Sequence, residues 1–129
     1  MVHSVGIDLV ETKRVEKSIG RFGRRFVNRI LGTDELTIYE SRKDKVGFLA
    51  GRFAAKEAVA KALGTGIWRN GIRWIDIEIL RDPESGAPLL SLHHAAAHHA
   101  QSLNLDEWSI SLSHTQTQAV AFVVAQNSR

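Results

Sequence analysis

Charged side chains interrupt an apolar helix in the segment from 51 to 66, GRFAAKEAVAKALGTG. Arg52 and Lys56 are four residues apart, and Glu57 and Lys61 repeat that spacing, so each pair follows one line along the predicted helix. The residues between them are apolar almost all the way round, which is typical of a buried helix, and buried charges are costly without partners. The Gly-Thr-Gly loop at its end lets backbone approach a ligand closely. One carboxylate for a metal, several cations and a glycine loop indicate a polyphosphate ligand.

A second carboxylate, Asp8, lies between apolar residues in a predicted strand, where aspartate is disfavoured. Its side chain is either a solvent-facing strand position or a metal ligand held on a rigid element. Glu57 has two interpretations as well: a surface partner of Lys61, worth little, or a second metal ligand. Two carboxylates completed by waters and phosphate oxygens suit Mg²⁺, which takes few protein ligands.

Another candidate, His114, ends a predicted strand and is followed by Thr115. It is either a structural residue or a phosphate-binding one. A Ser113–His114 nucleophile pair is disfavoured, because no acidic residue that could orient the imidazole stands nearby.

Four histidines in the segment 93–99 invite a zinc interpretation, since two of them are four residues apart. No further ligand or HExxH pattern accompanies them, so an exposed Ala/His-rich helix is favoured. The residues concerned are His93, His94, His98 and His99.

The elements that must position these side chains alternate between strands and helices. Periodicity and turn residues predict strands at 2–10, 72–80, 88–92, 108–114 and 119–125, and helices at 11–19, 24–31, 33–41, 44–63 and 93–103. The first strand is expected to be buried. In the second, Ile75, Ile77 and Ile79 are expected on one face, with Trp74, Asp76 and Glu78 on the other. The pattern predicts one α+β domain, 1–129, with a long helix against a mainly antiparallel sheet.

Composition limits the class of protein. The chain of 129 residues has no cysteine, which excludes disulfides and cysteine-based zinc or nucleophile chemistry. No apolar run is long enough to cross a membrane, and we expect a cytoplasmic protein. The net charge is +3, but basic residues crowd into 13–29, which predicts an anionic partner for that region.

Three segments together resemble one family. They are GIDLVE at 6–11, the block from 48 to 66, and SLSHT at 111–115. Together they resemble the holo-acyl-carrier-protein synthases, which are the small bacterial 4′-phosphopantetheinyl transferases. The resemblance covers nearly the whole chain. The resemblance implies the 4′-phosphopantetheinyl transferase fold. It also implies transfer of the phosphopantetheine arm of coenzyme A to a serine of apo-acyl carrier protein, releasing adenosine 3′,5′-bisphosphate in support of fatty acid biosynthesis.

The resemblance also implies roles for individual residues. Asp8 and Glu57 would hold Mg²⁺ against the pyrophosphate, and Lys61 would bind phosphate. The coenzyme A site would be lined by Arg52, Gly64, Thr65, His114 and Thr115. The carrier protein would dock on Arg14, assisted by Arg21, Arg24 and Arg25. The family forms trimers with active sites between subunits, so a homotrimer is expected. The base for the serine proton is either Glu57 or a water held by the metal.

Two other classes fit parts of the sequence. A small basic nucleic-acid-binding module would use the arginine cluster, but the aromatics do not interleave with the basic residues as stacking platforms. A fragment of a larger transferase of secondary metabolism is the other, and the length fits the small, self-associating type better. We expect neither nucleic acid nor membrane as a partner.

Overall fold

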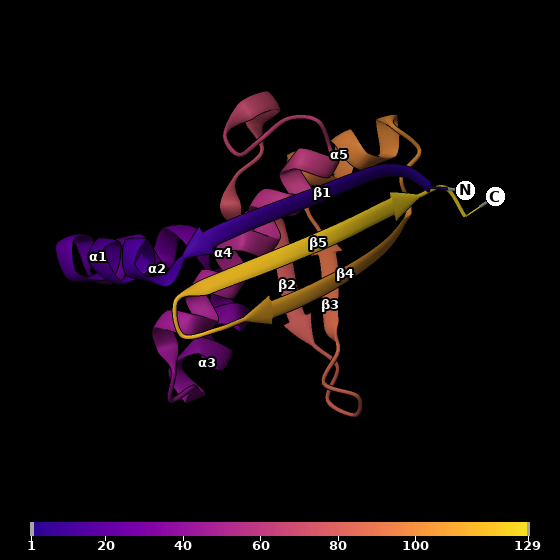
Figure 1. Cartoon of the computed structure of the whole chain (residues 1–129). Coiled ribbons are helices and arrows are strands. Elements are labelled where there is room, and N and C mark those ends of the chain that lie inside the picture. The colour runs from indigo at the N-terminus through magenta and orange to yellow at the C-terminus, as the bar shows by residue number, and fades with distance from the viewer. Residues whose placement is uncertain (1, 129) are drawn as a thin grey trace.

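The computed structural model describes residues 2–128 and has an α+β fold, as expected (Figure 1). Helices and strands follow the predicted order closely. The strands are β1 (Val2–Glu11), β2 (Ile77–Arg81), β3 (Pro88–Leu92), β4 (Glu107–His114) and β5 (Gln118–Gln126). The helices are α1 (Thr12–Phe22), α2 (Arg24–Ile30), α3 (Thr33–Ser41), α4 (Lys45–Ala62) and α5 (His94–Ser102), with short 3₁₀ turns η1 (Arg69–Gly71) and η2 (Trp74–Asp76).

The strands form two antiparallel sheets. β5 lies between β1 and β4 in a three-stranded sheet, and β2 and β3 form a separate hairpin. The long helix α4 lies across the inner face of the larger sheet, with α3 and the hairpin beside it (Figure 1). Because β1 and β4 are the two edges of that sheet, residues on them lie roughly 10 Å apart across β5.

Small residues let α4 approach the sheet closely. Ala119, Ala121 and Ala125 of β5 are fully buried, as are Ala54 and Ala58 of α4. At Gly6 of β1, an added Cβ would lie 1.9 Å from the carbonyl oxygen of Ala58, so only glycine fits there. This main-chain contact fixes the position of β1 relative to the helix.

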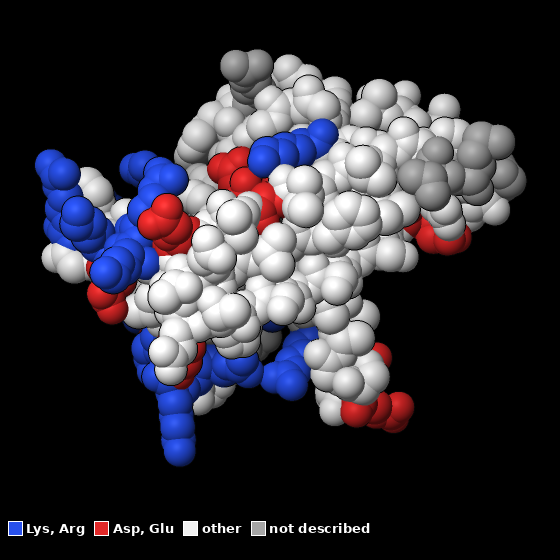
Figure 2. Space-filling model, viewed as in Figure 1, with Lys and Arg blue, Asp and Glu red and all other residues white. Residues whose placement is uncertain are grey.

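The expectation that the first strand is buried is wrong for one of its faces. Val5, Ile7 and Leu9 are more than half exposed, and Phe122 of β5 is 45% exposed beside them. The residues of β1 alternate between two faces as predicted, but the face that carries Gly6 and Asp8 is the one against α4. The helix lies too close to that face to leave room for larger side chains. Figure 2, viewed as Figure 1, shows mostly white, uncharged residues on this face of the sheet.

The predicted strand at 72–80 is also wrong in its first half. Residues 74–76 form η2, so Trp74 and Asp76 are buried while Ile75 is exposed, and regular strand begins only at Ile77. The Asp76 carboxylate accepts hydrogen bonds from the backbone and guanidinium of Arg73, which stabilises the turn. No helix among residues 2–128 combines the length and apolar character that crossing a bilayer requires.

Candidate active site

Asp8 faces α4 from the inner side of β1. The Nζ of Lys61 donates hydrogen bonds to Asp8 Oδ1 at 3.0 Å and to the carbonyl oxygen of Ile7 at 2.9 Å. The Asp8 side chain is 16% exposed and that of Lys61 is 52% exposed. The helical spacing suggested Glu57 as a partner of Lys61, but the hydrogen-bonded partner is Asp8. The pair joins strand and helix at the surface, where a ligand can reach both charges.

Glu57 lies half-buried beside this pair. Burial raises the pKa of its carboxyl above the ordinary value, the negative charge of Asp8 raises it further, and Lys61 opposes the rise. A cation bound beside Glu57 would relieve the unfavourable effect of burial and of the Asp8 charge on its ionised form. Among residues 2–128 no cluster of three or more potential metal ligands forms. A metal held by Asp8 and Glu57 would need water or ligand oxygens to complete its coordination. This donor set fits Mg²⁺, which keeps several waters.

The loop after α4 folds back on the helix end. Gly64 and Gly66 have φ angles of +77° and +79°, which favour glycine. The backbone N–H groups of Thr65 and Gly66 both donate to the carbonyl oxygen of Ala60. Thr65 is buried with its hydroxyl directed at the same carbonyl, so it caps the helix, while Gly64 is exposed.

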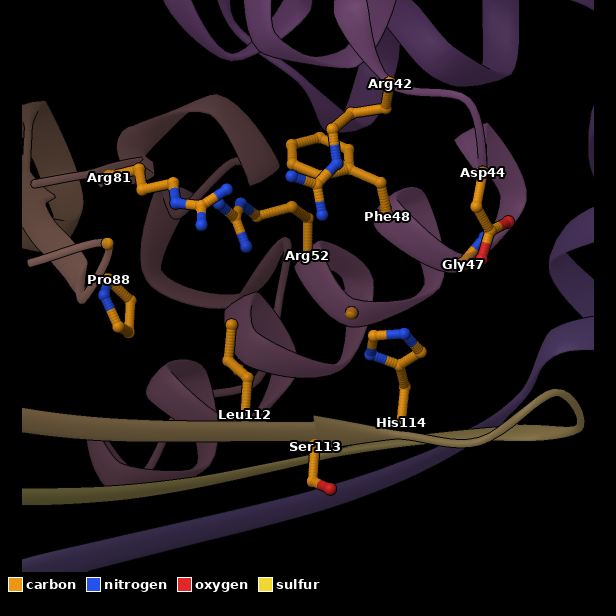
Figure 3. A pocket seen from close by; sticks show the side chains of 12 residues that line it. Arg42, Asp44, Gly47, Phe48, Arg52, Arg81, Pro88, Leu112, Ser113 and His114 are labelled. Atoms are coloured by element: carbon orange, nitrogen blue, oxygen red, sulfur yellow. The ribbon is translucent and has the colours of Figure 1, made fainter. Parts of the chain in front are cut away.

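A pocket of about 380 Å³ opens on the other side of α4 (Figure 3). Three arginines and a histidine converge on it: Arg42 after α3, Arg52 of α4, Arg81 at the end of β2, and His114 at the end of β4. Among the described residues, no carboxylate forms an ion pair with any of these arginines. Converging cations without a paired carboxylate make this pocket a candidate anion site.

Arg52 is the most firmly held of the three arginines. Its Nε donates to the carbonyl oxygen of Ile79 at 3.1 Å, and its guanidinium lies 4.5 Å from the centre of the Phe48 ring. Burial lowers the pKa of Arg52 to about 10, and the positive charges of Arg42 and Arg81 contribute to the decrease, while Glu35 opposes it. The guanidinium therefore stays charged at neutral pH, and a bound anion would relieve the repulsion among the cations.

Sequence reasoning missed Arg42 and Arg81. Neither belongs to a recognisable pattern, because one lies in a link between helices and the other in the strand before a turn. Lys56, which shares a charged line on the predicted helix with Arg52, lies in a different environment. Its side chain is fully buried and cannot contact a ligand.

The candidate residues at the end of β4 differ in where their side chains point and in what they contact. His114 and Leu112 point into the pocket, as the strand pattern predicts, whereas the Ser113 side chain points to the opposite side of β4 (Figure 3). This geometry excludes the Ser113–His114 pair within the chain. The Thr115 hydroxyl accepts hydrogen bonds from the backbone of Thr117 and Gln118, so it stabilises the β4–β5 turn.

The histidine-rich segment forms the predicted helix α5 without gathering its side chains. His93 lies 3.2 Å from a carboxylate oxygen of Glu78, and His99 lies 3.0 Å from the carbonyl oxygen of Leu63 at the end of α4. Both contacts join α5 and its N-terminal end to neighbouring elements.

The basic segment lies on α1 and α2. Arg14, Arg21, Arg24 and Arg25 are all exposed, and Figure 2 shows Lys and Arg side chains gathered where Figure 1 places these helices. Arg24 forms an ion pair with Glu40 of α3. Arg14 also borders a small pocket, whose apolar walls include Phe26 and Phe53.

The predicted site residues thus form two groups. Asp8, Glu57 and Lys61 lie on the β1 side of α4, and none of them lines the pocket that contains Arg52 and His114. Glu57 is five positions after Arg52, so their side chains point about 140° apart around the helix axis. The chain on its own does not bring the two groups together.

Comparisons with known proteins identify the class. The family description "4′-phosphopantetheinyl transferase superfamily" matches residues 4–123. The holo-[acyl-carrier-protein] synthase of Alkalilimnicola ehrlichii is 46% identical over 129 residues, covering 99% of each chain. The crystal structure of the Neisseria meningitidis enzyme of that name superimposes with a TM-score of 0.90 at 35% identity, covering 98% of this chain and 100% of that one. The Helicobacter pylori synthase in complex with coenzyme A has a TM-score of 0.82 at 36% identity, covering 95% and 99%.

The chain therefore belongs to the 4′-phosphopantetheinyl transferase superfamily, and within it to the holo-[acyl-carrier-protein] synthases. It is an enzyme of the phosphopantetheinyl transferase class, as the resemblance implied.

Proposed function

We propose that the chain transfers the 4′-phosphopantetheine group of coenzyme A to a serine of apo-acyl carrier protein, with Mg²⁺ held by Asp8 and Glu57. The observation that carries this proposal is the carboxylate pair beside Lys61, because phosphoryl transfer depends mainly on positioning and charge neutralisation. The coenzyme A complex of the Helicobacter pylori relative supports the donor. The product on the carrier would serve fatty acid biosynthesis.

The reaction forms one bond and breaks one. The serine Oγ attacks the phosphorus next to pantetheine, and the bond from that phosphorus to the bridging oxygen breaks, so adenosine 3′,5′-bisphosphate leaves. Lys61 neutralises charge on the phosphates. The acceptor for the serine proton is either the Glu57 carboxylate or a water held by the metal. A divalent cation on Asp8 and Glu57 would polarise the pyrophosphate when bound.

The arginine-lined pocket is proposed to hold the nucleotide end of coenzyme A. Arg52 and His114 were assigned to this site by resemblance, and Arg42 and Arg81 add two further cations. Pro88 offers apolar surface for a ring. Gly64, Thr65 and Thr115 are proposed to shape the backbone near the ligand, since the two threonine hydroxyls are engaged in local hydrogen bonds.

The separation of the two residue groups supports a shared active site. An exposed apolar face on the outer side of the sheet, formed by Val5, Ile7, Leu9 and Phe122, suits burial against another copy of the chain. A cyclic assembly would bring the β1 edge of one subunit near the β4 edge of its neighbour. We propose a homotrimer in which each site takes Asp8 and Glu57 from one subunit and Arg52 and His114 from the next.

One assay tests the proposed activity. Incubation with apo-carrier protein, coenzyme A and Mg²⁺ is expected to increase the mass of the carrier by one phosphopantetheine group, measured by mass spectrometry. A carrier whose acceptor serine is replaced by alanine is the control. An unchanged mass under conditions where a homologous synthase modifies the same carrier would reject the proposal.

The exposed arginines of α1 and α2 are proposed to dock the acidic carrier protein. Arg14→Glu is expected to raise the KM for carrier by roughly tenfold or more, with little effect on the KM for coenzyme A, because like charges would meet at the interface. Steady-state kinetics with each substrate varied measures both constants. Lys13→Glu makes the same charge change one residue earlier, pointing to another side of α1, and is expected to have a smaller effect. Equal effects on both substrates would contradict the docking role.

A further inference from the structure

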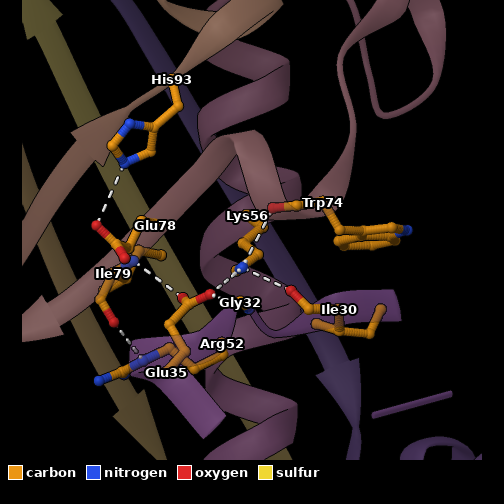
Figure 4. Close-up of polar contacts among 9 residues, drawn as sticks. All are labelled: Ile30, Gly32, Glu35, Arg52, Lys56, Trp74, Glu78, Ile79 and His93. Atoms are coloured by element: carbon orange, nitrogen blue, oxygen red, sulfur yellow. Dashed lines mark hydrogen bonds and ion pairs between the residues drawn. The ribbon is translucent and has the colours of Figure 1, made fainter. Parts of the chain in front are cut away.

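A buried ion pair lies where the mechanism assigns no role. Lys56 of α4 and Glu35 of α3 are both fully buried, with Lys56 Nζ 2.7 Å from Glu35 Oε1 (Figure 4). Replacing such a pair by apolar residues is often neutral or stabilising, so stability alone is a weak reason for its presence. The contacts around it indicate another role.

The Lys56 ammonium has an acceptor for each of its three donors. Besides Glu35, it donates to the carbonyl oxygens of Ile30 at 2.6 Å and Trp74 at 3.2 Å. One side chain of α4 therefore joins the ends of α2 and α3 to η2 (Figure 4). Every described polar side-chain atom that is buried in this region has a partner, so the network is complete.

Glu35 continues the network toward the anion pocket. Its Oε1 also accepts from the backbone N–H of Gly32, and its Oε2 accepts from the backbone N–H of Ile79 at 3.0 Å. The carbonyl oxygen of Ile79 in turn accepts from Arg52 Nε at 3.1 Å. Two hydrogen bonds through a single residue of β2 therefore connect the Glu35 carboxylate with the Arg52 guanidinium.

The elements joined by this network carry all three pocket arginines. Arg42 follows α3, which begins at the Glu35 end, Arg52 lies on α4, and Arg81 ends β2 two residues after Ile79. Their guanidinium groups repel one another, and they would separate unless the backbone beneath them were held.

We propose that Glu35 and Lys56 are positioning residues for nucleotide binding. They hold Ile79, and through it the Arg52 guanidinium, in the orientation that receives an anionic group of coenzyme A. This inference rests on the proposed function, because it requires that the arginine-lined pocket bind the nucleotide end of coenzyme A.

Two uncharged double variants differ in whether residue 35 keeps a side-chain acceptor for the backbone N–H of Ile79. Glu35→Gln/Lys56→Met keeps an acceptor for the Ile79 N–H, whereas Glu35→Leu/Lys56→Met removes it, and neither leaves an unpaired buried charge. Affinity for adenosine 3′,5′-bisphosphate is measured by calorimetric titration, and folding by circular dichroism and thermal unfolding. We expect the leucine variant to bind about tenfold more weakly than wild type and the glutamine variant to stay within about threefold. Equal affinities of the two folded variants would overturn the inference.

A double-mutant cycle with Arg52→Ala tests the route through Arg52. If the network acts through this guanidinium, Glu35→Leu/Lys56→Met weakens binding less than about twofold in the Arg52→Ala background. Additive losses would overturn the inference and leave the proposed function intact. Full affinity of Arg52→Ala itself would overturn both, because the pocket would then not bind the nucleotide.

A shorter side chain gives the same test if the leucine variant does not fold. Glu35→Asp keeps the charge opposite Lys56 but withdraws the carboxylate by one methylene from the Ile79 N–H. Weaker nucleotide binding in the wild-type background, with no further loss in the Arg52→Ala background, is the expected result. Unchanged affinity of folded Glu35→Asp would overturn the inference.

Discussion

Alanine at Asp8 or Glu57 is expected to lower the rate of phosphopantetheine transfer by about a thousandfold or more while the protein stays folded. Each carboxylate is proposed to supply one of two protein ligands to the metal, and the charge that the metal neutralises develops in the transition state. Single-turnover transfer, followed by the mass of the carrier, measures the loss. Near-normal turnover of either variant at saturating Mg²⁺ would contradict the assignment.

The stability of these variants distinguishes a metal ligand from a structural residue. Burial and Asp8 raise the pKa of Glu57 in the folded protein, so its ionised form opposes folding. The protonated Glu57 carboxyl therefore adds to the free energy of unfolding at low pH, and this contribution is lost as the pH rises through the raised pKa of Glu57. Glu57→Gln is therefore expected to unfold at the same or a higher temperature than wild type at neutral pH. Glu84→Gln, in the exposed β2–β3 turn, is the matched control and should retain full activity.

Mixed assemblies of two inactive variants are expected to regain activity. One variant, Asp8→Ala, lacks a carboxylate of the proposed metal site. The other, the double variant Arg52→Ala/His114→Ala, lacks the two residues that the neighbouring subunit is proposed to supply. If each site takes one side from each of two neighbouring subunits, equal co-expression yields about a quarter of the wild-type number of sites, because both contributing sides must be intact. Two different affinity tags allow mixed assemblies to be purified and assayed for transfer.

The control for this experiment combines two defects on the same side of the site. Asp8→Ala co-expressed with Glu57→Ala leaves every site with at least one missing metal ligand and is expected to remain inactive. Recovery in this control would mean that the assay detects something other than shared sites. If the first mixture stayed inactive although mixed assemblies formed, each subunit would have to contain a complete site.

Much of the fold followed from periodicity, and the errors have physical causes. The alternation in β1 is evident in the sequence, but alternation alone does not show which face is buried. The large apolar residues Val5, Ile7 and Leu9 suggested a buried face, and they are exposed. The inner face is set by Gly6 and by the small residues of α4, which allow a close approach. In 72–76, alternating residues suggested strand, whereas Asp76 turns the backbone through its own hydrogen bonds.

Where a motif is present, residues singled out in the sequence lie together in the structure. Asp8 and Lys61 were identified separately, and they meet at 3.0 Å. Arg42 and Arg81 were not predictable, because only the packing of α3 and the hairpin beside α4 brings them to Arg52. Burial of Lys56 depends on Glu35, twenty-one residues earlier in the chain, and no local pattern connects the two.

The contact at Gly6 has a consequence for how this protein tolerates change. No residue with a side chain fits between β1 and the carbonyl oxygen of Ala58, so every substitution would lift the strand away from the helix. Asp8, two residues further along, would move with it and away from Glu57. The spacing of the two carboxylates therefore depends on a close backbone contact, which the buried alanines of α4 and β5 also make possible. A substitution at Gly6 is therefore expected to affect the metal-ligand pair although Gly6 itself contacts no ligand.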